Sequence, residues 1–228
     1  SMPTCNDNTP TTAWHQTAAT RRFATAAGLL ALLMIGCAGS ADRFAPQYAA
    51  YRQGMHALLV LQPEVRLFEQ LPDGSRLFQD LASRRAGEQL QQSIAGQLQR
   101  HGFRAAAADA PTMGMPGVAE ITLLYRSVNR AIRLHTYGPQ IYPAKVKAFD
   151  YHLGSVSELL QANQADGLVL VIGYQAHATP AAENWLAIAV VEPGGRIVWY
   201  ARQRDSGQFD LRRSDDIDRM VAGTMARF

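Results

Sequence analysis

An apolar run of 14 residues near the amino terminus, Phe23–Gly36, separates this chain into a leader and a domain. The run follows Arg21-Arg22 and ends at Cys37. A helix that crosses a membrane needs about 20 apolar residues, whereas the core of a secretory signal peptide needs about 7–15, after a positive segment and before small residues. The run therefore predicts a signal peptide over residues 1–36, and the folded domain is expected beyond it.

The end of this run, Met34-Ile35-Gly36-Cys37, resembles the lipobox of bacterial lipoproteins, although Leu is commoner than Met at its first position. The resemblance implies that cleavage between Gly36 and Cys37 leaves Cys37 as the first residue, with diacylglycerol on its thiol. In these lipoproteins, an Asp directly after the lipidated cysteine implies retention. Ala38 occupies that position here, and it implies sorting to the outer membrane and a periplasmic location. The alternative is an ordinary signal peptide that is followed by an incidental cysteine.

A single acyl chain, such as one palmitate, binds a membrane only marginally, whereas two or more chains keep a protein anchored. A Cys37 that carries two or more acyl chains would therefore stay bound to the bilayer. Residues 38–54 contain glycine, serine, proline and polar residues and predict a flexible tether. Seventeen residues of coil span about 20–25 Å. The expected organisation is a signal peptide at 1–36, a lipidated cysteine and tether at 37–54, and one periplasmic domain at 55–228.

Charge and cysteine content exclude several classes of protein. Lys and Arg number 22 and Asp and Glu 19, which gives a net charge of +3. The basic pairs Arg84-Arg85, Arg202/Arg204 and Arg212-Arg213 have acidic residues nearby, so we expect a solvated surface of mixed charge and no nucleic-acid partner. A weak role at an anionic membrane or polymer surface is the alternative. Cys5 and Cys37 lie on opposite sides of the predicted cleavage site, which excludes a disulfide framework in the mature domain.

The pattern along residues 55–228 predicts a single α/β (α+β) domain, with a mixed sheet of about five strands and three to four helices. Leu90, Ile94 and Leu98 recur at helical spacing over residues 81–101, and Gly102 follows as a left-handed cap. A capping box at residues 155–158 predicts another helix, and Ser214 is expected to cap the last one. The strongest pair of strands is 185–191 and 196–203, joined by Glu-Pro-Gly-Gly.

Three segments carry a resemblance to known proteins. One helix ends in Arg-His-Gly-Phe before a strand, a second reads LLQANQADG before the strand LVLVIGY, and the hairpin ends in GGRIVWY. Together they resemble the domain shared by the curli secretion channel lipoprotein, the penicillin-binding-protein activator lipoproteins and the amino-terminal domain of the Tol translocation protein. The resemblance covers residues 55–228 and implies the fold and a partner-binding or oligomeric role, with no catalysis.

The residues offer little chemistry. His56, His101, His135 and His152 lie outside metal-binding spacings, and no nucleophile elbow or phosphate-binding loop occurs. We therefore expect no metal, no cofactor and no enzymatic activity. A periplasmic enzyme is a minor alternative that would need Asp150, Tyr151 and His152 to meet in a cleft.

Two loops are better candidates for contact with a partner. Met113 and Met115 lie between prolines and glycines, where exposed methionines form adaptable surfaces. Tyr137 and Tyr142 lie in an aromatic, proline-containing segment, and tyrosine is favoured at interfaces. The bland alternative is that these side chains only pack over the domain's own edge.

The sequence thus predicts a non-enzymatic lipoprotein, anchored to the outer membrane, that binds a partner or assists assembly in a cell-envelope complex. The alternative is a homo-oligomeric structural or secretion-channel subunit. Its channel-forming relatives carry long alternating segments that insert in the membrane, and this chain shows no clean pair of them.

Overall fold

The computed structural model describes residues 42–137, 143–177, 183–205 and 207–228. Its strands are β1 (Arg43–Phe44), β2 (Ala57–Val60), β3 (Glu64–Gln70), β4 (Arg76–Phe78), β5 (Arg104–Ala107), β6 (Gly167–His177), β7 (Glu183–Val191) and β8 (Ile197–Asp205). Its helices are α2 (Tyr48–Gly54), α3 (Asp80–Arg100), α4 (Ala110–Met113), α5 (Val118–Ile132), the π-helix η1 (Arg133–Tyr137), α6 (Pro143–Lys147), α7 (Ser157–Ala162) and α8 (Ser214–Thr224).

The strands form one mixed sheet in the order β1-β8-β7-β6-β2-β5. Strand β6 is paired along one edge by two consecutive strands, since Leu58 of β2 lies opposite Gly167 and Glu64 of β3 lies opposite Ile172. Pro63 separates these two strands and has no N–H to donate to a ladder. Strand β4 then pairs with β3 and extends this part of the sheet outward.

The α/β class and the single mixed sheet are confirmed, but among the described residues the sheet has eight strands where about five were expected. One additional strand is β3, which Pro63 separates from β2, and the other two are β1 and β4, which are two and three residues long. Strands this short show no alternation that a sequence pattern could reveal. Their pairing with β8 and β3 defines them.

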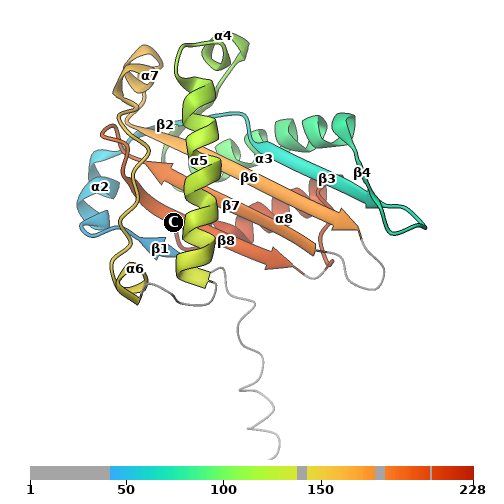
Figure 1. Cartoon of the computed structure of the whole chain (residues 1–228). Coiled ribbons are helices and arrows are strands. Elements are labelled where there is room, and N and C mark those ends of the chain that lie inside the picture. Colours follow the sequence, from blue (N-terminus) through green and yellow to red (C-terminus); the bar gives the residue numbers. More distant parts are fainter. Residues whose placement is uncertain (1–41, 138–142, 178–182, 206) are drawn as a thin grey trace, which may run out of the picture. The chain divides into compact units, whose positions relative to one another are not determined.

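Helices cover both faces of the sheet (Figure 1). Helices α3 and α8 lie behind it, where Leu90, Ile94 and Met220 pack against Val169 and Val171 of β6. Helix α5 crosses in front of it, and the front face is buried by side chains of α5, of α7 and of the extended segment 149–156. Successive residues of β6 alternate between the two cores, as the two-residue period of a strand requires.

The predicted helix ends are partly confirmed. Gly102 adopts φ +87° after α3, and the Phe103 N–H donates to the Leu98 carbonyl at 3.1 Å, which is the expected left-handed cap. The capping box at 155–158 is wrong: α7 begins at Ser157, and no side chain caps it. Ser214 is the first residue of α8 and not its cap, since Arg213 holds that position.

The expected tether is shorter than 38–54, because its second half is folded. Arg43 and Phe44 pair with Tyr200 and Trp199 of β8, and the Ala45 side chain is buried in the core behind the sheet. The folded domain therefore begins at β1, twelve residues before Met55. This segment is folded because it pairs with the distant strand β8, which its composition does not reveal.

The hairpin of β7 and β8 is confirmed, with its ladder running from Asn184 opposite Asp205 to Val191 opposite Ile197. Its turn packs on the extended segment 149–156. Gly195 adopts φ +94°, and a Cβ built there would lie 1.8 Å from the Gly154 carbonyl oxygen. The turn therefore needs a glycine at this position.

Among the described residues, no helix is long and apolar enough to cross a membrane.

Candidate functional site

The floor of the candidate site is a row of side chains that runs across four strands at the front of the sheet. Arg66 lies opposite Tyr174, Tyr174 opposite Trp185, and Trp185 opposite Arg204. Side chains of residues that are directly opposite in a ladder share one face. The row therefore places two stacked aromatic rings, 5.7 Å apart between centroids, between two arginines.

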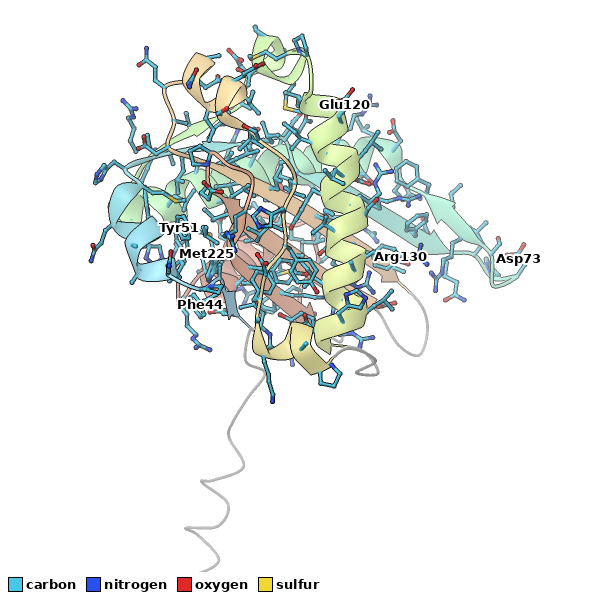
Figure 2. The ribbon with its side chains drawn as sticks, turned by 60° about the vertical axis from the view of Figure 1, so that its left-hand side comes forward. Phe44, Tyr51, Asp73, Glu120, Arg130 and Met225 are labelled. Carbon is cyan, nitrogen blue, oxygen red and sulfur yellow. The ribbon has the colours of Figure 1, made fainter. Side chains whose placement is uncertain are left out.

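The wall of the site is the carboxyl-terminal half of α5 with η1. Arg126, Arg130 and Arg133 follow each other at spacings of four and three, which places them on one side of the helix. Figure 2 shows Arg130 on the side of α5 that faces the β3–β4 hairpin, whose tip is marked by Asp73. The helix is held to the sheet by a buried hydrogen bond in which the Tyr200 hydroxyl donates to Asn129 Oδ1 at 2.8 Å.

Floor and wall enclose a cavity of about 640 Å³, which we call the arginine pocket. Its charged lining has a clear excess of cations: Arg66, Arg126, Arg130, Arg133, Arg202 and Arg204 against Glu64 and Glu183. Each glutamate already pairs with one arginine, Glu64 with Arg126 at 3.0 Å and Glu183 with Arg204 at 3.5 Å. The remaining cations have no acidic partner among the described residues.

Arg133 and Arg202 both approach the indole ring of Trp185. The Arg133 guanidinium carbon lies 4.6 Å from the centroid of Trp185, and that of Arg202 lies 5.5 Å from it. The Arg202 Nε is buried and has no hydrogen-bond partner among the described residues. Burial, together with the nearby charge of Arg133, lowers the pKa of Arg202 from its usual value. Two cations are thus held together in a partly desolvated place.

Tyr137, one of the predicted contact residues, lines the arginine pocket. The Arg43 guanidinium carbon lies 5.5 Å from its ring centroid, and that of Arg202 lies 6.0 Å from it. Burial raises the pKa of Tyr137 to about 12, although the two arginines oppose the shift. Its phenol is therefore neutral at physiological pH. Tyr142 lies outside the described residues.

Met113 and Met115 are half-buried and pack in part against the front core, and their contact with a partner stays a prediction. The Asn163 amide lies 3.8 Å from the Met115 sulfur. Helix α4 causes this: it forms where a loop was expected, begins with an Asp109 side chain that accepts from the Thr112 N–H, and turns the methionines inward. Met113 still lines a shallow hollow beside the pocket, with Arg66 and Phe78.

Gly36 and Cys37 lie outside the described residues, so the cleavage and lipidation sites remain predictions. The enzymatic alternative needed Asp150, Tyr151 and His152 to meet, and the structure separates them. The Asp150 carboxylate pairs with His152 and Arg196 at the surface, while Tyr151 is buried and its hydroxyl lies 3.4 Å from His135 Nδ1. Among the described residues, no cluster of three or more metal-ligating side chains occurs.

The pocket was not predicted from the sequence, although two of its signals are readable there. Arg202 and Arg204 are two residues apart on a strand, which places both on one face, and Arg126, Arg130 and Arg133 have helical spacing. Nearby acidic residues in the sequence made Arg202 and Arg204 resemble an ordinary surface pair. Asp205 instead turns back on its own loop and accepts from the Gly207 and Phe209 N–H groups.

No protein-family model matches this sequence, and no curated protein matches it. Among solved structures, the chain is similar to the PelC dodecamer of Paraburkholderia phytofirmans, with TM-score 0.41, 12% identity and coverage of 82% of this chain and 94% of that one. It is also similar to lipoprotein GNA1162 of Neisseria meningitidis, with TM-score 0.34, 11% identity and coverage of 75% of this chain and 94% of that one.

A third similar structure is the LpoB carboxyl-terminal domain of Salmonella enterica, with TM-score 0.30, 11% identity and coverage of 71% of this chain and 93% of that one. At such low identity, the pocket residues of this chain must be judged by their own chemistry.

Proposed function

We propose that this protein is a lipoprotein anchored to the outer membrane through Cys37, which binds a partner of the cell envelope without transforming it. The arginine pocket carries the proposal. Guanidinium groups keep their protons at neutral pH and serve as donors, not as general bases, and the aromatic floor offers a surface for packing. Such a site binds and orients an anionic group.

The anchor is tested by metabolic labelling with radioactive palmitate. The chain contains two cysteines, Cys5 and Cys37, and Cys5 lies in the predicted leader, so it provides a matched control. We expect Cys37→Ala to abolish the label and Cys5→Ala to leave it unchanged. Label that survives Cys37→Ala would refute the anchor, and so would label that Cys5→Ala removes.

Partner binding is tested with a photo-crosslinking residue placed at Arg130 in intact envelopes, followed by mass spectrometry. Arg130 lines the pocket, whereas Arg84 is exposed on α3, behind the sheet, and serves as the matched control position. A recurrent envelope protein that is captured from position 130 and not from position 84 supports the partner-binding role. Equal capture from both positions would contradict the assignment of the pocket.

A homo-oligomer is the second candidate function, and exposed apolar side chains favour it. Leu123 on α5 is 55% exposed, and Leu77, Phe78 and Leu81 are 45–57% exposed around β4 and the start of α3. Exposed apolar groups of this kind mark protein contacts when they are contiguous. The same crosslinking experiment separates the two functions, because self-association gives a regular ladder of adducts between copies of this chain.

A further inference from the structure

The arginine pocket lies next to the point where the chain enters the domain. Five residues lie between Cys37 and Arg43, the first residue of β1, and the six fully extended steps from one to the other span about 20 Å. Arg43 in turn contacts the Tyr137 ring, which lines the pocket beside Arg202. An anchor at Cys37 would therefore keep this pocket within a short reach of the bilayer.

Basic residues occur at this end of the domain. The sequence has only two lysines, Lys145 and Lys147, both belong to α6, and the Lys147 side chain is exposed. Helix α6 packs against η1, which supplies Arg133 and Tyr137 to the pocket. Asp42 adds one negative charge at this end, and its buried carboxylate pairs with Arg227 at 3.5 Å. The basic residues Arg43, Arg133, Arg202 and Lys147 outnumber it.

The pocket also lacks the counter-charge that its own arginines require. Arg133 and Arg202 approach the same indole, and no acidic side chain among the described residues pairs with either of them. Two like charges in a partly desolvated site repel each other. A guanidinium binds phosphate in a fork of two parallel hydrogen bonds. A bound phosphate would supply the missing charge and satisfy the Arg202 Nε.

Building on the proposed function, we propose that the arginine pocket binds the phosphate headgroup of an anionic lipid in the bilayer that holds Cys37. Anionic headgroups give a membrane surface a negative potential that attracts basic side chains within about a Debye length. The anchor turns this contact into an intramolecular one and raises the effective concentration of headgroups at the pocket. Headgroup binding would orient the domain, so that α5 and the β3–β4 hairpin keep a defined direction relative to the membrane.

The test is hydrogen–deuterium exchange on the full lipidated protein in nanodiscs. One set contains phosphatidylcholine alone, and the other contains phosphatidylcholine with phosphatidylglycerol. We expect amides of residues 129–137 and 199–205 to exchange at least about threefold more slowly with phosphatidylglycerol, and amides of α3 to be unchanged. Equal exchange in the two sets would overturn the proposal. Protection by inorganic phosphate in phosphatidylcholine discs, without protection by phosphatidylglycerol, would also overturn it, because the source would then be free phosphate.

The double variant Arg133→Gln/Arg202→Gln should lose this protection, whereas Arg84→Gln/Arg85→Gln on the rear helix α3 should keep it. The melting temperature of the double variant, measured without lipid, shows whether the two substitutions disturb the fold. Since the two cations repel each other and pair with no acidic side chain among the described residues, we expect the pocket variant to melt no lower than wild type at low ionic strength. A lower melting temperature would assign Arg133 and Arg202 a structural role and refute the proposal.

Failure of this inference can be told apart from failure of the proposed function. Loss of palmitate labelling from wild type would refute the anchor itself. Retained labelling, retained crosslinking to an envelope protein from position 130 and no lipid-dependent protection would refute only the lipid ligand.

Discussion

The two faces of the sheet are built from similar strands, but helices cover them to different extents. Behind the sheet, the 21 residues of α3 and the 11 residues of α8 bury Leu90, Ile94, Leu98 and Met220 to 0% exposure. In front, α5 crosses the strands and leaves the later residues of β6 and β8 and the first residues of β3 and β7 to the arginine pocket. The rear face therefore contributes a closely packed core, whereas the incompletely covered front face exposes charged and aromatic side chains to a ligand.

The largest expected effect is on the rear face. Leu90→Ala removes a fully buried side chain from the core between α3 and the sheet. We expect a loss of about 3 kcal/mol in the free energy of unfolding, from lost burial and the remaining cavity. Urea denaturation measures it. A loss of less than about 1 kcal/mol would mean that the rear face is loosely packed and that the two faces do not differ in packing as described above.

An intermediate effect is expected where α5 is tied to the front of the sheet. Tyr200→Phe removes the hydroxyl that donates to Asn129 and leaves a buried amide oxygen without this donor. We expect a loss of about 1–2 kcal/mol. Hydrogen exchange should accelerate in α5 more than in α3, and equal acceleration in both helices would show that this bond does not act locally.

A pH-dependent effect should separate the faces, because Asp216 belongs to the rear helix α8. Its carboxylate accepts from the Asp210 N–H at 3.0 Å and pairs with Arg219, and both interactions lower the pKa of Asp216. Since the folded pKa is below the unfolded one, the stabilisation is complete above about pH 4 and disappears as the pH falls further. Urea denaturation of wild type and Asp216→Asn should therefore differ at pH 7 and converge at low pH. A difference that persists at pH 2 would exclude this ionisation as its cause.

The smallest effect is expected on the outer side of α5. Leu123 is 55% exposed, so Leu123→Ala should change the stability of the monomer by no more than about 0.5 kcal/mol. The same measurement at high protein concentration sharpens the comparison. A concentration-dependent loss would show that Leu123 is buried between copies of this chain and would favour the oligomeric function.

Much of the fold was predictable because its signals are local. The period of Leu90, Ile94 and Leu98 identified α3, the glycine after it gave the cap, and the Glu-Pro-Gly-Gly turn identified the β7–β8 hairpin. The capping box failed because the Ser155 hydroxyl instead donates to the Pro193 carbonyl of that hairpin, 38 residues away. A tertiary contact replaced the local one.

The site was predictable only in part. Tyr137 was expected at a contact surface and lines the pocket, whereas Met113 and Met115 lie outside it and pack in part against the front core. The arginines of the pocket come from β3, α5, η1 and β8, which are far apart in the sequence. Their grouping depends on strand order and register, and no spacing along the chain encodes either of these.

By itself, the sequence determined the elements with a strong local period, the excess of arginine over lysine, and the predicted signal peptide and lipid anchor. These follow from neighbours a few residues apart, whose hydrophobicity and backbone preferences act without the rest of the fold. Only the tertiary structure decided that β1 belongs to the sheet, that β2 and β3 share an edge of β6, and that Arg133 and Arg202 meet over Trp185. Long-range strand pairing brings such groups together, and their charges interact only after it has formed.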